Sequence, residues 1–285
     1  MTVVVASRDR RDELTATLGR HRAPVVLVDN GSTDGTPEAV RTAHPDVDVV
    51  RLGRNLAAAA RTIGVRRART PYVAFADDDS WWAPGSLHAA AEVLAARPEV
   101  GAVTATTLVG PAGDRDPFSE ALTASPLRGR HGDLPGPRII GFMACATMVR
   151  RTDFLAVGGF DDVVRFPGEE ERLAWDLTAA GVDLVLVPAV VVHHHPSPRR
   201  SAPAARRRGV ARSRLLTGVM RLPWSTVAAR TAADVLSGAP ERRGLWDARS
   251  DLAAALRERR VLPADVLADI RAVAGPGRRR HRPRE

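Results

Sequence analysis

The chain has 285 residues, of which 44% are hydrophobic and 26% are charged, and these proportions are ordinary for a globular protein. All 42 basic side chains are arginines, and the net charge is +9. The single cysteine, Cys145, excludes an internal disulfide and a zinc site made of several cysteines. No secretory signal is visible, and the longest apolar run, residues 184–192, is too short to span a membrane. We therefore expect a cytoplasmic protein, either free or at the inner face of the membrane.

Apolar runs and helical patterns alternate along the first 109 residues. We expect strands at residues 3–6, 24–29, 47–52, 72–76 and 100–109, and helices at residues 11–20, 36–43, 56–68 and 84–97. Strands that alternate with helices at this spacing predict βαβ units. The expected fold class is therefore α/β, with a Rossmann-like, mostly parallel sheet flanked by helices.

The second half of the chain is less regular. Residues 110–138 lack periodicity, so we expect an insertion or a mobile loop over the site. Strand-like content follows at 139–150, a helix at 168–180, a buried strand at 183–192, a basic linker at 197–212 and further helices up to about residue 273. These patterns predict one domain at 1–200 with halves at 1–109 and 110–200, a helical C-terminal extension at 201–274 and a disordered basic tail at 275–285.

Three of the expected strands end in polar clusters. They are Asp29-Asn30-Gly31-Ser32, Asp77-Asp78-Asp79 and His193-His194-His195. The carboxyl ends of parallel strands lie along one edge of the sheet, where open α/β proteins bind their ligands. A solvated acidic loop and a surface histidine tract remain as alternatives for the second and third clusters.

Alternation of side chains along a strand divides these clusters further. It places Asp77 and Asp79 on one side of the chain and Asp78 on the other, and it places His193 and His195 on a common side. Two carboxylates and an imidazole at a strand end suit a divalent cation and the phosphates that it carries.

A fourth cluster, Glu169-Glu170-Glu171-Arg172, lies at the start of an expected helix. Carboxylates are stabilised there by the helix dipole, so these residues can be purely structural. The alternative is a general base that takes a proton from an attacking hydroxyl.

Taken together, the motifs resemble glycosyltransferase family 2, whose members have the GT-A fold. The resemblance covers roughly residues 1–200 and depends on the order of the motifs. They are Ser7-Arg8-Asp9-Arg10, the run 28–36, Arg54-Asn55 with Arg61 and Gly64, Asp77-Asp78-Asp79, Gly158-Gly159-Phe160-Asp161, Glu169-Glu170-Glu171 and a terminal histidine.

The resemblance implies a metal-dependent, inverting transfer from a nucleoside-diphosphate sugar, with UDP or dTDP as the nucleotide, to a hydroxyl. The acceptor would be a glycan, a lipid-linked sugar or a small molecule, in cell-envelope polysaccharide, glycolipid or natural-product synthesis. It also implies that residues 1–109 bind the nucleotide sugar and that residues 110–200 supply the acceptor site and the base. The cofactor would be Mn²⁺ or Mg²⁺.

The resemblance also assigns roles to individual residues. Donor contacts would come from Ser7, Arg10, Asp29, Asn30, Ser32, Asn55, Arg61, Asp77 and Asp78. The metal ligands would be Asp79 and His193, with His195 as the alternate. The base would be Glu170, with Glu169 and Glu171 as alternates. The acceptor region would include Gly159, Phe160 and Trp81.

Four positions depart from the family pattern. Ala57 stands where glycine is frequent, and Thr62 where asparagine is frequent. Arg172 replaces a frequent acid, and Asp176 stands where arginine is common. These departures leave open which glutamate is the base and whether the protein is catalytic at all.

Two other functional classes remain as alternatives. One is a sugar nucleotidyltransferase, and the other is a non-catalytic protein that binds nucleotide sugars or nucleic acid. With 4% aromatic residues, the chain has few platforms on which bases could stack, so nucleic acid is not the expected partner. The basic C-terminal region could instead contact a membrane surface peripherally.

Overall fold

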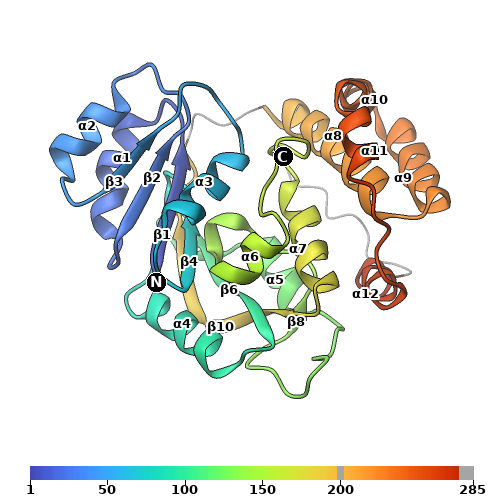
Figure 1. Ribbon diagram of the computed structural model, residues 1–285, viewed down its shortest axis with the longest axis horizontal. Helices are drawn as coiled ribbons and strands as arrows, with labels where there is room; N and C mark the ends of the chain where they lie inside the picture. The colour runs from blue at the N-terminus through green and yellow to red at the C-terminus, as the bar shows by residue number, and fades with distance from the viewer. Residues whose placement is uncertain (198–201, 276–285) are drawn as a thin grey trace.

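A computed structural model of the chain describes residues 1–197 and 202–275 (Figure 1). One mixed sheet forms its centre, in the strand order β3-β2-β1-β4-β9-β6-β10-β5. These strands are β1 (Thr2–Ser7), β2 (Val25–Asp29), β3 (Asp48–Arg51), β4 (Tyr72–Ala76), β5 (Ser80–Trp82), β6 (Val100–Val109), β9 (Thr147–Arg150) and β10 (Asp183–His194). Two short strands lie off this path: β7 (Asp114–Arg115) pairs with β6, and β8 (Arg138–Ile139) pairs with β10.

The first four strands of the order, from β3 to β4, are parallel to one another, as the sequence predicted. The sheet is mixed beyond them, because β9 runs antiparallel to both β4 and β6. Strand β10 is parallel to β6, so β1, β2, β4, β6 and β10 all end at the same edge. The predicted α/β class is therefore confirmed. The three polar clusters lie along this carboxyl edge of the sheet.

Helices cover both faces of the sheet. One face is packed by α1 (Arg11–Thr17), α2 (Thr36–Ala43) and α4 (Ser86–Ala96), and the other by α3 (Ala59–Arg67), α6 (Arg151–Ala156) and α7 (Glu169–Ala179). The alternation of β1 explains this, because Val3 and Val5 join the first core and Val4 joins the second. Gly64 lets α3 approach β1 closely, since an added Cβ would lie 2.4 Å from Val4 Cγ1.

A bundle of helices follows the sheet domain and lies beside α7 (Figure 1). It consists of α8 (Pro203–Arg221), α9 (Trp224–Ser237), α10 (Ala239–Asp247), α11 (Leu252–Arg257) and α12 (Ala264–Ala274). The predicted linker at 197–212 is wrong from residue 203 on, because α8 begins with a proline in its first turn and continues through alanines and arginines, which favour helix. Residues 198–201 of that prediction lie outside the described residues. None of the described helices combines the length and apolarity that a membrane crossing needs.

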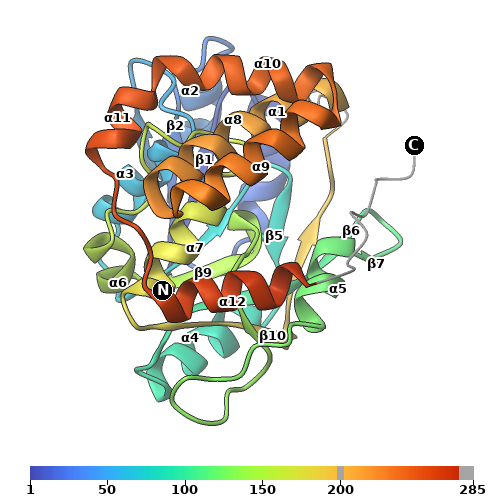
Figure 2. The same cartoon turned by 90° about the vertical axis from the view of Figure 1, so that its right-hand side faces the viewer.

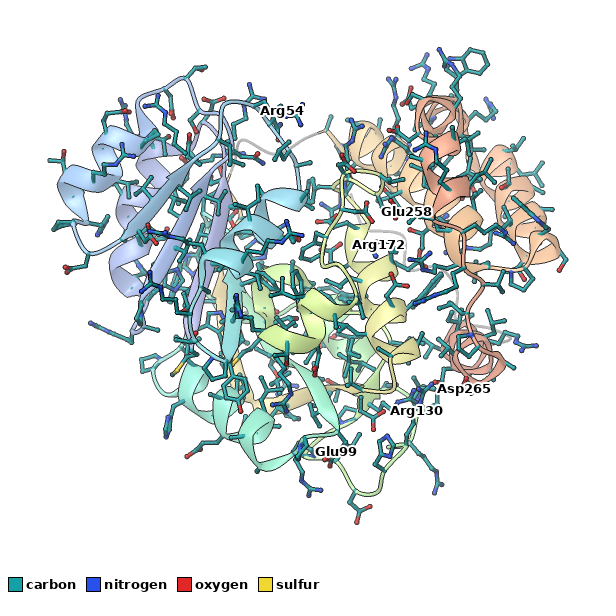
Figure 3. The ribbon with its side chains drawn as sticks, viewed as in Figure 1. Arg54, Glu99, Arg130, Arg172, Glu258 and Asp265 are labelled. Atoms are coloured by element: carbon teal, nitrogen blue, oxygen red, sulfur yellow. The ribbon has the colours of Figure 1, made fainter. Side chains whose placement is uncertain are left out.

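The segment 110–138 corrects another expectation. It contains β7 and the helix α5 (Pro117–Thr123), and only its first part lies near the carboxyl edge. Its later part lies at the opposite edge, where Arg138 pairs with Val185 near the start of β10. Arg130 also forms a 2.9 Å ion pair with Asp265 of α12 (Figure 3). Most of the segment is therefore anchored away from the site.

Candidate active site

Arg61 of α3 connects two of the acidic clusters. Its Nη2 lies 2.6 Å from Asp77 Oδ1, and its Nη1 lies 3.4 Å from Glu169 Oε1. Burial opposes the charge of this guanidinium, but the two carboxylates outweigh burial and raise the pKa of Arg61 above its ordinary value. The acidic triplet and the start of α7 therefore meet around one buried cation.

The three glutamates at the start of α7 have different surroundings. Glu169 is 1% exposed; burial and the neighbouring Glu170 raise its pKa to about 8, although Arg61 lowers it. Glu171 pairs with Arg230 of α9 at 2.8 Å. Glu170 is partly exposed, and within the described residues no arginine forms an ion pair with it.

Burial also raises the pKa of Glu170, against the effects of its own backbone amide, of the Arg61 charge and, least, of the Ala144 backbone amide. Ala144 belongs to a short 3₁₀ turn, Ala144–Ala146, and no sequence motif predicted its place near Glu170. The same turn carries Cys145, whose thiol is buried, and burial raises its pKa well above the ordinary value.

Asp78 lies on the other side of the triplet from Arg61 and receives a hydrogen bond from Ser7 Oγ at 2.6 Å. Burial raises the pKa of Asp78 to about 6, the Ser7 bond lowers it, and the charges of Asp77 and Asp79 raise it further. The structure thus joins the end of β1 to the triplet.

The histidine beside Asp79 is His194, with 3.3 Å between Nε2 and Oδ1. His193 and His195 instead contact the Trp81 ring, at centroid distances of 5.5 and 4.6 Å. The reason is β5, a strand that the sequence analysis missed. It pairs antiparallel with β10 and sets His193 opposite Trp81. The His195 backbone amide donates to the Asp79 carbonyl at 2.8 Å, so His194 and His195 both lie beside Asp79, and which imidazole binds a metal stays a prediction.

A divalent cation would suit the oxygen and nitrogen atoms at Asp79 and His194. The described residues contain no group of three or more His, Cys, Asp or Glu side chains that could hold a metal ion. A cation there would therefore take further ligands from substrate oxygens and water, as cations bound together with phosphates do. The Ser197 amide also donates to Asp79 Oδ2 at 2.9 Å, and Ser197 Oγ accepts from Arg10 Nη1 at 3.1 Å.

The predicted donor residues at the end of β2 hold the loop that follows this strand at the carboxyl edge of the sheet. Asp29 is buried and accepts from the backbone amide of Ser32 at 3.3 and 3.4 Å. Asn30 donates to the Ala57 carbonyl at 3.0 Å, and Asn55 Oδ1 accepts from the Ala57 amide at 2.8 Å. Ala57 has a φ of +49°, a conformation that favours glycine, which explains the family preference at this position.

The predicted acceptor region is mostly internal. Phe160 is 2% exposed and packs against Phe75 and Phe154, with centroids 5.8 and 5.7 Å away. Gly159 is fixed by its φ of +66° and by its carbonyl, which accepts from Arg172. Of the three predicted residues, Trp81 is the one with a partly exposed side chain, and Arg20 lies 4.1 Å from its ring centroid.

The departures at residues 172 and 176 are explained together. Arg172 Nη1 lies 2.5 Å from Asp176 Oδ2 on the next turn of α7, so the frequent acid and arginine have exchanged places. Arg221 of α8 also contacts Asp176, with 2.5 Å between Nε and Oδ1. Figure 3 places Arg172 on the side of α7 that faces the C-terminal helices. The reversed pair therefore fastens α7 to the bundle and leaves Glu170 in place.

Comparison with known proteins supplies the family. Residues 2–158 match the family described as Glycosyl transferase family 2. A curated relative from Mycobacterium tuberculosis (strain ATCC 25618 / H37Rv), N-acetylglucosaminyl-diphospho-decaprenol L-rhamnosyltransferase, is 30% identical over 208 residues. That match covers 60% of this chain and 66% of the relative, so just under two thirds of the relative is represented.

Two solved structures show the likeness of fold. The mannosyltransferase PcManGT from Pyrobaculum calidifontis, in complex with GDP-Man and Mn²⁺, has a TM-score of 0.61 at 22% identity, over 96% of this chain and 85% of that one. TarS 1–349 from S. aureus, in complex with UDP, has a TM-score of 0.59 at 17% identity, over 94% and 82%. Both comparisons extend into the C-terminal helices, since they cover more of the chain than the sheet domain alone.

Proposed function

This chain belongs to glycosyltransferase family 2, and on that premise we propose that it moves a sugar from a nucleoside-diphosphate sugar to an acceptor hydroxyl in cell-envelope synthesis. The observation that carries the proposal is Arg61, which draws Asp77 and Glu169 to one point of the carboxyl edge. A donor site and a basic carboxylate thereby stand side by side. A lipid-linked diphospho-sugar acceptor is supported by the name of the curated relative.

Glu170 is the proposed base. Its neighbours Glu169 and Glu171 are engaged by Arg61 and Arg230, whereas Glu170 is partly exposed. A carboxylate with a raised pKa accepts a proton more readily. As Glu170 takes the proton of the acceptor hydroxyl, the acceptor oxygen bonds to the anomeric carbon from the face opposite the diphosphate. The bond to the diphosphate breaks with its electron pair, which gives a nucleoside diphosphate and inversion.

The donor side depends on the acidic triplet. Asp79 and His194 would hold Mn²⁺ or Mg²⁺ together with the diphosphate, and such a cation stabilises the negative charge of the departing group. Asp77 and Asp78 stay oriented by Arg61 and Ser7, so they can contact the ribose and the phosphates. UDP and dTDP are the proposed nucleotides, as the motif pattern implied.

The test is the pair Glu170→Gln and Glu171→Gln, assayed with a nucleotide sugar and an N-acetylglucosaminyl-diphospho-prenol acceptor. Glu170→Gln should lower transfer by about 10²- to 10⁴-fold while calorimetry shows unchanged donor binding. Glu171→Gln is the matched control and should stay within a few fold of the wild type, because its carboxylate pairs with Arg230. Retained transfer in Glu170→Gln, with loss in Glu171→Gln, would move the base to the other residue.

A further inference from the structure

An exposed apolar surface lies on the C-terminal helices, outside the active site. In the described part of the chain, six of the eight exposed large hydrophobic side chains fall between residues 224 and 261. They are Trp224, Val235, Leu236, Trp246, Leu256 and Val261. Figures 1 and 2 place α9 on the outside of the molecule, with α8 between it and the sheet domain. Three of the six, Trp224, Val235 and Leu236, line one hollow, and such clustering marks an interaction surface rather than the scattered exposure of an ordinary surface.

The centre of this surface is one face of α9, which we call the α9 stripe. An open hollow of about 730 Å³ is lined by Trp224, Val227, Ala228, Thr231, Ala232, Val235 and Leu236. These residues recur every three or four positions and therefore share one side of the helix. Asp234, the one acid of α9, is 1% exposed and pairs with Arg214 at 2.5 Å, so it adds no charge to the stripe.

Arginines border the apolar side chains. The Arg259 guanidinium lies 4.0 Å from the Trp224 ring centroid, and the Arg249 guanidinium lies 4.0 Å from that of Trp246. Arg242 Nη1 donates to the carbonyl of Val235 at 3.2 Å. Arginine side chains therefore border the exposed apolar side chains of α9 and of its neighbour α10.

The bundle as a whole is also positively charged. Residues 202–275 contain 14 arginines and 7 carboxylates, a net charge of +7, whereas residues 1–197 contain 21 arginines and 25 carboxylates, a net charge of −4. Most of the acids in the bundle are held in ion pairs, such as Asp247 with Arg208 and Asp251 with Arg212. Seven exposed arginines of the described bundle form no ion pair with a described carboxylate: Arg206, Arg242, Arg243, Arg249, Arg257, Arg260 and Arg271.

We infer that the α9 stripe and its arginine rim dock on the surface of an anionic lipid bilayer. Exposed Leu, Val and Trp side chains enter the boundary between headgroups and acyl chains, and arginines bind the anionic headgroups around them. Nucleic acid would use the arginines but leave the aliphatic stripe in water. A second copy of the chain would bring two faces of charge +7 together, which is unfavourable.

The inference goes beyond the proposed function, because binding to vesicles needs neither donor nor acceptor. It gives the enzyme a fixed orientation at the membrane, with the bundle beside α7 in contact with the bilayer. An acceptor linked to a lipid would then reach Glu170 without leaving the membrane surface.

The experiment is co-sedimentation of the full chain with vesicles of phosphatidylglycerol and phosphatidylcholine, and with vesicles of phosphatidylcholine alone. We expect binding to the first and little to the second. Val235→Ser/Leu236→Ser should lower the partition coefficient about tenfold, because side chains that are 43% and 85% exposed contribute apolar area to the bilayer. Arg242→Gln/Arg243→Gln should lower it roughly fivefold for each arginine.

The matched control is Phe118→Ser, which removes a 44% exposed hydrophobic side chain from α5, outside the bundle. It should bind like the wild type, and circular dichroism should show that every variant is folded. Equal binding by Val235→Ser/Leu236→Ser and Phe118→Ser would overturn the inference. So would a dimer in sedimentation velocity that the stripe variant abolishes, if the wild-type chain does not bind anionic vesicles.

Discussion

The substitution Asp176→Asn tests how α7 is held in place. Asp176 is 5% exposed and lies between two buried arginines. Its Oδ2 is 2.5 Å from Arg172 Nη1 and 2.9 Å from Arg221 Nη2, and its Oδ1 is 2.5 Å from Arg221 Nε. The amide would keep the shape of the carboxylate and remove its charge. The positive charges of Arg172 and Arg221, which are 3% and 8% exposed, would then lie close together without the negative charge of Asp176 between them.

Removing one partner of a buried ion pair costs about 3–5 kcal/mol, because it leaves a buried charge uncompensated. We expect Asp176→Asn to lie in this range, even though Asp161 still pairs with Arg172 at 2.8 Å. The exchange Arg172→Asp/Asp176→Arg restores the polarity common in the family. It should not recover the stability, because an arginine at 176 would face Arg221 of α8.

Urea unfolding followed by circular dichroism measures the effect, provided that the m value is unchanged. The matched control is Asp48→Asn, whose carboxylate lies 2.6 Å from Arg67 Nε with both side chains at least 40% exposed. Such a surface pair contributes about 0–1 kcal/mol. A loss for Asp176→Asn no larger than that for Asp48→Asn would refute the reasoning, since burial would then not decide the cost.

Two further predictions concern the acidic triplet. Asp79→Ala should abolish the tightening of UDP binding by Mn²⁺ in calorimetry, because His194 alone cannot hold the cation, and unchanged tightening would show that the cation binds elsewhere. Burial raises the pKa of Asp78 from 3.8 in the unfolded chain to about 6, so the unfolded chain releases this proton first. Its contribution to stability is therefore full below pH ~4 and is lost as the pH rises to about 6. Thermal melts should show Asp78→Asn gaining on the wild type across this window, and a constant difference would contradict the assignment.

Much of the architecture follows from the sequence, because it depends on local patterns. The alternation of strands and helices over residues 1–109 predicted the α/β class, and the order of motifs predicted the family. The turn-forming run at 29–35 and the acidic run at 77–79 marked two strand ends of the carboxyl edge. Side-chain periodicity and strand ends are properties of neighbouring residues, so they can be read without the fold.

Choices among equivalent residues depended on partners far away in the chain. Which imidazole pairs with the Asp79 carboxylate was decided by the antiparallel pairing of β5 with β10, and three adjacent histidines carry no signal for that register. The distinction among Glu169, Glu170 and Glu171 came from Arg61 on α3 and Arg230 on α9.

In the C-terminal region, too, some properties follow from the sequence and others only from the fold. The basic character of the C-terminal region is written in the sequence as arginine clusters. Which of those arginines are paired, and which side of α9 stays uncovered, became visible only in the packing of α8, α9 and α10. Composition thus determined the charge of this region. The tertiary structure decided where that charge remains available, because ion pairing and burial depend on contacts between helices that local sequence does not specify.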